Sequence, residues 1–341
     1  MGTRLKQDDH PVQICGRVFL SPVANRKKQY LMIRITMKKI TQFFLVITIL
    51  ALMLAGCAPA AAVPQAITLT DGLGRTVALD QPAERIVSLA PSATEILFAV
   101  GAGDQVVGRD SFSNYPESVL ELQDVGGSMG DYSFETIASL NPDLVVLTEI
   151  NTPEQVKALE DLGLTVYYIK NPVQLDGLYP ILETVGQLTG HDKEAADLVD
   201  SLTARVAAVT ETIAKSQAKP LVFYELDGSD AAKPWTSGPN TFMEQLIQMA
   251  GGVNVGSAMT DAWAQISLEE LLVQDPDLIL LGDAAYGMTA EQVATRAGWE
   301  TLTAVKNNAI YPFNDDMASR PGPRMVDGLE ALAKLIHPEL Y

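Results

Sequence analysis

Short apolar runs alternate with helical patterns along two stretches of the chain. In the first, the strand-like runs ERIVSLA, QVVGR, DLVVLTE and TVYYIK are separated by PSATEILFAVGAG, FETIASL and PEQVKALEDLGL. In the second, LVFYEL, DLILLGD and AIYPF alternate with FMEQLIQMAGG, SLEELLVQ and RMVDGLEALAKLIHPEL. Strands that alternate with helices across short loops predict an α/β fold with parallel sheets and helices on both faces.

A longer helical pattern lies between these stretches and contains neither Gly nor Pro. Its apolar residues share one stripe at spacings of 4, 4, 3 and 4: Leu198, Leu202, Val206, Val209 and Ile213. We therefore predict two Rossmann-like lobes, 68–190 and 219–341, joined by one rigid linker helix over 191–218. The ligand cleft is expected between the lobes. A rigid linker helix would allow the lobes only small opening motions.

The first helix of the N-terminal lobe has expected start and stop signals. Ser92 is a candidate N-cap with Glu95 three residues later, which is the pattern of a capping box. Gly101 follows the last apolar residue and is expected to end the helix.

One phrase occurs twice at an offset of 134 residues: SFETIASLNPDLVVL (133–147) and SLEELLVQDPDLILL (267–281). Each copy reads as a helix, a Pro-Asp turn and a strand, one copy per lobe. Any α/β protein contains similar units, so two pseudo-symmetric lobes and chance similarity both remain open. With pseudo-symmetry, Glu135 and Glu269 occupy equivalent places in the first turn of a helix, where a carboxylate is favoured.

The N-terminal segment has the features of an export signal. Met37-Lys38-Lys39 is basic, ITQFFLVITILALM is apolar but short for a membrane span, and Leu-Ala-Gly precedes Cys57. This end resembles a bacterial lipobox, so we expect a lipoprotein signal peptide over 37–56, acylation of Cys57 and a tether over 57–67. A plain secretory signal with a chance Cys is the alternative. Residues 1–36 are expected to be an upstream extension from gene calling, with translation starting at Met37.

The part of the chain after the signal is strongly acidic, with 15 Lys and Arg against 40 Asp and Glu beyond residue 56. Such a surface repels nucleic acid and bare anionic lipid. It is typical of a soluble protein or of one that docks on a basic partner, and acidity that serves solubility alone is the simpler interpretation.

Several motifs together resemble the helical-backbone class of ABC-importer substrate-binding proteins, over about residues 68–341. They are the lipobox, RIVSLAPSATEILFAVGAGDQVVGRDSFSNYP, the PDLVVL and PDLILL strands, PWTSGPNTF and SRPGPR before the terminal helix. The class binds cobalamin, ferric siderophores or haem. VVGRDSFSNYP is most similar to the cobalamin-binding branch.

The resemblance implies ligand contacts from aromatic Phe112, Trp235 and Trp263 and from Arg320. Met317 and Thr148 stand where that branch has aromatic residues, and Tyr132 is a candidate substitute for a Trp that is missing nearby. Aromatic faces with a few polar anchors are also what a large flat ligand needs. The simpler interpretations are aromatic residues packed under loops and a solvated Arg320; Arg109 is a weaker candidate anchor. The resemblance further implies that Glu135 and Glu269 meet arginines on the two subunits of a permease dimer.

Metal and enzyme chemistry find little support in the sequence. Only Cys15 and Cys57 are present, and none of His10, His191 and His337 falls in a predicted cleft loop. His191 and His337 are expected at the surface. A GxSxG elbow and a Walker A loop are both missing from the sequence. We predict no metal, no catalysis and no cofactor.

Taken together, the sequence predicts a monomeric, lipid-anchored, extracytoplasmic subunit of an ABC importer. It would capture cobalamin or a related corrinoid and deliver it to a permease dimer with its ATPase subunits, without contact with nucleic acid. A ferric-siderophore or haem binder of the same class is the alternative, and an envelope enzyme or sensor domain is a remote one.

Overall fold

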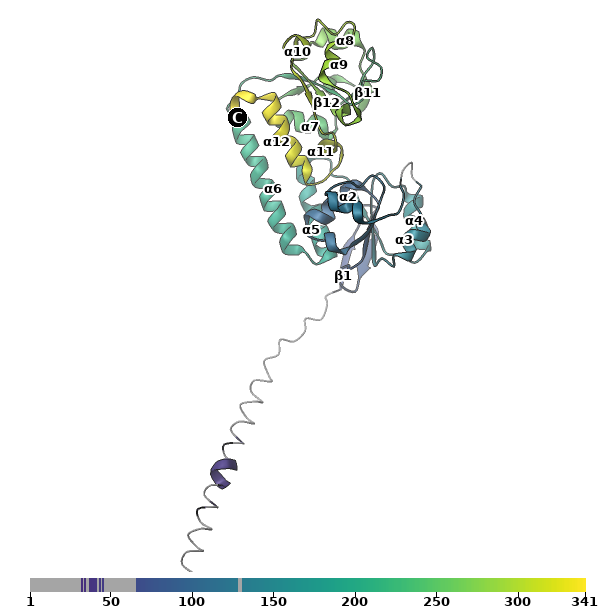
Figure 1. Ribbon diagram of the computed structural model, residues 1–341, viewed down its shortest axis with the longest axis vertical. Coiled ribbons are helices and arrows are strands. Elements are labelled where there is room, and N and C mark those ends of the chain that lie inside the picture. The colour runs from purple at the N-terminus through teal and green to yellow at the C-terminus, as the bar shows by residue number, and fades with distance from the viewer. Residues whose placement is uncertain are drawn as a thin grey trace, which may run out of the picture. The chain divides into compact units, whose positions relative to one another are not determined.

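The computed structural model divides into two compact units, residues 1–63 and 64–341 (Figure 1). It describes residues 32, 34, 37–41, 43, 45, 66–127 and 131–341. Most of the predicted upstream extension, signal peptide and tether, Cys57 included, lies outside the described residues. Of the helices within the described part of the chain, none combines the length and the apolar character needed to cross a bilayer.

The N-terminal lobe is built on a parallel sheet of five strands in the order β5-β4-β3-β6-β7. Its strands are β3 (Ile86–Ser88), β4 (Val106–Arg109), β5 (Gln123–Asp124), β6 (Leu144–Thr148) and β7 (Val166–Ile169). Its helices are α2 (Pro91–Ala99), α3 (Phe134–Ser139), α4 (Pro153–Asp161) and α5 (Leu178–Thr189). An antiparallel hairpin, β1 (Ile67–Thr70) and β2 (Thr76–Leu79), precedes them.

The C-terminal lobe has a parallel sheet of four strands in the order β10-β8-β12-β13. Its strands are β8 (Leu221–Glu225), β10 (Val253–Asn254), β12 (Leu278–Leu281) and β13 (Ile310–Pro312), with an antiparallel hairpin of β9 (Trp235–Ser237) and β11 (Trp263–Gln265). Its helices are α7 (Phe242–Met249), α8 (Leu268–Gln274), α9 (Ala290–Ala294), α10 (Thr303–Lys306), α11 (Asp316–Ser319) and α12 (Arg324–Ile336). Short 3-10 turns complete both lobes: η1 (Gly103–Gln105), η2 (Glu117–Glu121), η4 (Leu175–Gly177), η5 (Val255–Ala258), η6 (Gly282–Tyr286) and η7 (Pro338–Leu340). The predicted α/β fold with two lobes is confirmed.

One hydrophobic core is shared by both lobes. Strand residues alternate between sheet faces, so Val146 and Leu280 contribute to the shared core while their neighbours Val145 and Ile279 enter separate outer cores. Helices α2, α5, α7 and α12 cover the shared face of the sheets, and α3, α4, α8, α9 and α10 cover the outer faces. Both faces of the central strands β6 and β12 are buried, which explains why their sequences are continuous apolar runs without alternating polar residues.

The linker helix α6 (Asp192–Ile213) packs its apolar stripe against this shared core. Its 22 residues span about 33 Å. The helix ends five residues before the predicted limit, and Figure 1 shows α12 running beside it. Arg205 of α6 donates to Asp327 at 2.6 Å and to Glu330 at 2.8 Å, both on α12. Arg205 thus fixes the linker helix to the last helix of the C-terminal lobe.

The doubled phrase occupies equivalent places in the two lobes. In each sheet the first strand is central: β3 lies between β4 and β6, and β8 lies between β10 and β12. The pair β3-β6 therefore corresponds to the pair β8-β12. Asp143 accepts hydrogen bonds from the backbone N–H groups of Glu84 and Arg85 at 2.8 and 3.0 Å, and Asp277 accepts one from Leu221 at 2.7 Å. The Asp of each Pro-Asp turn therefore fixes the start of the first strand of its lobe. These shared contacts support pseudo-symmetry over chance similarity.

Two local predictions are corrected. The first helix starts at Pro91 after Ala90, because proline at the first helical position displaces the start by two residues, and Ser92 is not its cap. His337 is buried, with 1% of its surface exposed, since it ends α12 against Gly251 and pairs with Glu339 at 3.0 Å. His191 is half-buried at the start of α6.

Replacing Arg205 with Ala is expected to lower the free energy of unfolding by about 1 kcal/mol at pH 7, since the clamp is partly exposed. The hydrogen bond from Arg205 is the main cause that lowers the pKa of Glu330 below 4.5. The clamp is therefore fully effective above about pH 4.5, and its contribution is lost as the pH falls through the lowered pKa. Urea unfolding at pH 7 and pH 3 measures the difference.

The matched control is Lys193→Ala, which removes an exposed pair within α6 and should change stability by less than about 0.5 kcal/mol. An effect of Arg205→Ala that is equally large at pH 3 would contradict the proposed clamp.

Candidate functional site

Exposed apolar side chains follow the carboxyl ends of the parallel strands in both lobes. In the N-terminal lobe, Phe112, Ile150 and Val173 follow β4, β6 and β7. In the C-terminal lobe, Tyr286 follows β12, and Trp235 and Trp263 lie on the β9–β11 hairpin. The carboxyl ends of parallel strands share one edge of a sheet, which is where open α/β folds bind ligands. Each lobe therefore presents an apolar binding edge.

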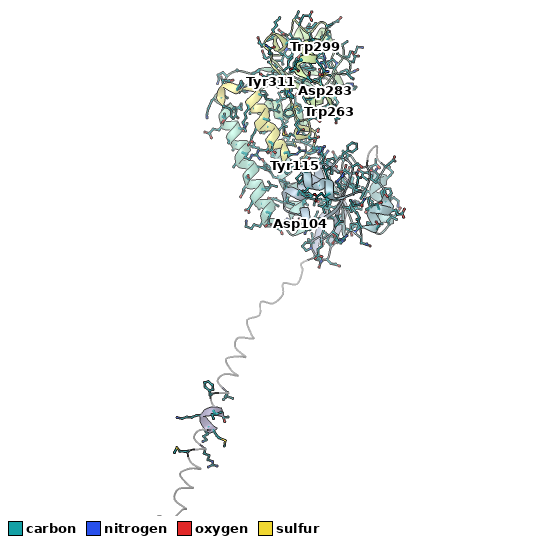
Figure 2. All side chains as sticks on the ribbon, in the orientation of Figure 1. Asp104, Tyr115, Trp263, Asp283, Trp299 and Tyr311 are labelled. Atoms are coloured by element: carbon teal, nitrogen blue, oxygen red, sulfur yellow. The ribbon has the colours of Figure 1, made fainter. Side chains whose placement is uncertain are left out.

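Trp235 and Trp263 form a paired aromatic surface on the C-terminal lobe. In the β9–β11 hairpin, Trp235 pairs with Gln265 and Trp263 pairs with Ser237, which places both indoles on one face as diagonal neighbours. They are 39% and 44% exposed. The third tryptophan, Trp299, is fully buried within the lobe, where its Nε1 donates to the Ala231 carbonyl at 3.1 Å (Figure 2).

Phe112 is held outward by the buried carboxylate of Asp110. Oδ2 of Asp110 accepts the Phe112 N–H at 3.0 Å, and Oδ1 accepts the Ser113 hydroxyl. Burial raises the pKa of Asp110, while these two donors oppose the shift. The weaker candidate Arg109 is buried and bonds to the Val119 and Asp110 carbonyls at 3.0 and 2.9 Å, so its guanidinium is used inside the lobe.

Tyr132 lies at the edge of the N-terminal outer core. Its hydroxyl donates to the Leu89 carbonyl at 2.8 Å and accepts from Asn151 Nδ2 at 2.8 Å. Burial, with a smaller effect from Asp110, raises the pKa of Tyr132 to about 12. The hydroxyl is thus committed to bracing the loops after β3 and β6. Thr148, at the end of β6, is buried.

Arg320 lies in an ionic cluster that joins the lobes. The carboxylate of Glu95, on α2, accepts hydrogen bonds from Arg324 at 2.5 and 2.8 Å and from Arg320 at 3.2 Å. Arg320 also donates to Asn114 at 2.7 Å and pairs with Asp316 at 2.9 Å. Two carboxylates, Glu95 and Asp316, neutralise much of the charge of Arg320. Its guanidinium is therefore held in place and is not a free cation.

Tyr115 and Met317 lie beside this cluster. The guanidinium of Arg324 stacks over the Tyr115 ring, 4.2 Å from its centre, and Figure 2 shows Tyr115 near the junction of the lobes. Met317, on α11, is half-buried and packs against α12 beside Gly328. Only part of its side chain is therefore available to a ligand.

Glu135 and Glu269 are exposed and occupy the same position in equivalent helices. Each is the second residue after a Ser N-cap, Ser133 in α3 and Ser267 in α8. Helix α3 leads into β6 and helix α8 leads into β12. Each helix runs opposite to the strand that follows it, so its N-terminus lies at the edge that carries the loops after the strands. The two glutamates thus mark matching points on the lobes.

The chain matches the periplasmic binding protein family over residues 86–316. It belongs to that family. A Bacillus subtilis protein described as an uncharacterized ABC transporter substrate-binding lipoprotein is 32% identical over 89% of this chain and 99% of the relative. A cobalamin-binding protein of Halobacterium salinarum is 30% identical over 80% of this chain and 74% of its own length.

Two solved family members have the same fold. The periplasmic vitamin B12 binding protein BtuF of Vibrio cholerae aligns with a TM-score of 0.64 at 29% identity, over 75% of this chain and 98% of its own. The periplasmic heme-binding protein RhuT of Roseiflexus sp. RS-1 aligns with a TM-score of 0.68 at 28% identity, over 76% and 100%. The resemblance seen in the sequence is confirmed.

Sequence reasoning missed several residues of this candidate site. Ile150, Val173 and Tyr286 carry a readable signal, an apolar residue in the polar loop directly after a strand. Glu95 carries none, because its partners lie more than 220 positions away. Among the described residues, no group of three or more His, Cys, Asp or Glu could hold a metal ion.

Glu95→Gln is expected to lower the free energy of unfolding by about 3 kcal/mol, since it leaves two nearly buried guanidinium groups with Asp316 as their remaining acid. The control, Glu183→Gln, removes an exposed carboxylate on α5 and should cost less than about 0.5 kcal/mol. Urea unfolding compares them; equal effects would show that Glu95 does not join the lobes.

Proposed function

We propose that the protein is the extracytoplasmic substrate-binding subunit of an ABC importer and that it captures cobalamin or a related corrinoid. The observation that carries this proposal is the pair of apolar edges, with Phe112 in one lobe and Trp235 and Trp263 in the other. A corrin is broad and has apolar faces, so it requires aromatic contact from two sides and few charged anchors.

The relatives support the same ligand class. Proteins from Halobacterium salinarum and Vibrio cholerae that match this chain at 30% and 31% identity are described as binding cobalamin or vitamin B12. Other relatives of known structure are described as heme-binding or as a possible iron-binding protein. Hemin and a ferric siderophore are therefore the comparison ligands for any binding test.

Delivery would use Glu135 and Glu269. Two carboxylates at equivalent points of two pseudo-symmetric lobes match a partner with two equivalent basic sites, which a permease dimer offers. Their attraction to arginines on the permease would weaken as salt increases. Acylation of Cys57 would keep the subunit at the membrane face on which the permease opens, and the subunit itself would act as a monomer.

Cyanocobalamin is expected to bind the purified chain at one site with a submicromolar Kd by isothermal titration calorimetry. Trp235→Ala and Trp263→Ala should each weaken binding about tenfold, which corresponds to about 1.4 kcal/mol. Tyr341→Ala, which removes an exposed aromatic beside α12, should leave affinity unchanged. Saturable binding of hemin or a ferric siderophore, without a response to cyanocobalamin, would keep the class and overturn the ligand.

Glu135→Lys combined with Glu269→Lys should abolish uptake in cells that carry the cognate permease, because like charges would face each other at both contacts. Affinity for cyanocobalamin should stay within about twofold. The matched control is Glu154→Lys with Glu291→Lys, which reverses exposed carboxylates at the same position of α4 and α9. Equal loss of uptake in the control, or loss of ligand binding in the test variant, would contradict the docking role.

A further inference from the structure

A pocket of ≈ 410 Å³ lies where β8 and β12 end, and the family resemblance assigns it no role. These strands are parallel neighbours, with Leu281 opposite Glu225. The pocket is lined by residues of the two loops that follow them: Leu226, Asp227, Ser229, Asp283, Tyr286 and Met288. It therefore belongs to the binding edge of the C-terminal lobe, and Figure 2 labels Asp283 there.

Asp283 is a buried carboxylate with a hydrogen-bond donor on one of its two oxygens. Oδ2 accepts the Gly228 N–H at 2.9 Å, whereas Oδ1 is buried and has no hydrogen-bond partner among the described residues. Only 7% of the residue is exposed. Burial raises the pKa of Asp283, and the Gly228 N–H and the charge of Arg296 oppose that shift. A buried acceptor without a donor is unfavourable, so a donor supplied by a ligand would be stabilising.

Arg296 is the cation whose charge acts on the Asp283 carboxyl, but its hydrogen bonds go to other groups. Arg296 binds both oxygens of Glu225 at 2.5 and 2.9 Å and stacks over Trp299, 4.6 Å from its ring centre. It also donates to the Gly228 carbonyl at 3.2 Å. A side chain at Gly228 would come within 2.3 Å of Glu225 Oε1, so glycine lets this loop lie directly on the ion pair. Arg296 is thus engaged by Glu225 and by the Gly228 carbonyl.

The pocket carries a second acid. Asp227 is exposed, and its carboxylate accepts a hydrogen bond from the Ser229 N–H at 2.8 Å. This hydrogen bond lowers the pKa of Asp227, so the carboxyl group is ionised at neutral pH. Of the six lining residues, two are acids and none is basic. This charge attracts donors and repels ligand carboxylates. Tyr286, 91% exposed, adds an aromatic face at the rim.

We propose that this pocket is a subsite for an N–H donor group of the ligand, a primary amide or an ammonium, which binds Oδ1 of Asp283. The inference rests on the proposed function, because it assumes that the ligand occupies the C-terminal binding edge. It makes Asp283 and Asp227 the residues that select against ligands whose periphery carries carboxylates. A corrinoid bearing primary amides satisfies this subsite, and haem, with two propionates, does not.

The first test compares Asp283→Asn with the unaltered full-length chain by calorimetric titration of cyanocobalamin. The Asn carbonyl oxygen can still accept the Gly228 N–H, but its NH₂ group cannot accept from a ligand. We expect affinity to fall at least tenfold. Glu300→Gln, an exposed carboxylate-to-amide change in the same lobe, is the control and should leave affinity unchanged.

The second test needs no substitution and so does not depend on the folding of a variant. Cyanocobalamin derivatives, each with one peripheral amide hydrolysed to a carboxylate, are titrated into the unaltered chain together with hemin. At least one monoacid should bind ten or more times more weakly than the parent, and Asp283→Asn should reduce that penalty. Hemin should bind more weakly than cyanocobalamin.

The outcomes separate the two proposals. If cyanocobalamin binds and neither Asp283→Asn nor any monoacid loses affinity, the subsite is wrong and the proposed function stands. If hemin binds more tightly than cyanocobalamin, the selection against carboxylates is overturned and the importer class is retained. If no probe of the class binds, the proposed function fails and this inference fails with it.

Discussion

The pairing of Glu95 with Arg324 and Arg320 is the contact on which the arrangement of the lobes depends. A carboxylate from the first helix of one lobe is buried against two guanidinium groups from the other, at 2.5 to 3.2 Å. Buried charges of this kind are expensive to separate, because each would be left without a partner in a site of low polarity. The shared apolar core along α6 holds the lobes together from one side, and the ionic cluster sets their register at the junction. In this structure, the cluster and the shared core together set how the strand ends of the two lobes face each other.

The pseudo-symmetry of the two lobes underlies the proposed docking. Asp143 and Asp277 fix the first strand of each sheet by the same backbone contact, so the two lobes keep the same geometry at their strand ends. Helices that run opposite to the strands then present Glu135 and Glu269 at matching points. Under the proposed function, a dimeric partner would meet two copies of one surface, which is the simplest way for a single chain to bind a two-fold symmetric target.

Under the proposed function, ligand selection would depend on which charges are already paired. The basic residues near the binding edges are largely engaged: Arg109 by carbonyl groups, Arg320 by acids and Arg296 by Glu225. The unpaired oxygen of Asp283 is an acceptor. An acidic edge with aromatic faces favours broad, uncharged ligands whose periphery donates hydrogen bonds, since a ligand carboxylate would find repulsion in place of a partner.

The sequence by itself determined the alternation of elements, the linker helix and the doubled unit, because these follow from local periodicity and from repeated turn residues. It also marked Phe112, Trp235 and Trp263 through motifs that the family shares. Only the tertiary structure decided the roles of Glu95 and Asp283, and it moved His337 from the surface to the interior. Burial and ion pairing are set by contacts between residues far apart in the chain, and no local pattern encodes which partner a charged side chain will meet. For the same reason, the local sequence predicted a capping box for Ser92 and Glu95, whereas in the folded protein Glu95 pairs with Arg320 and Arg324.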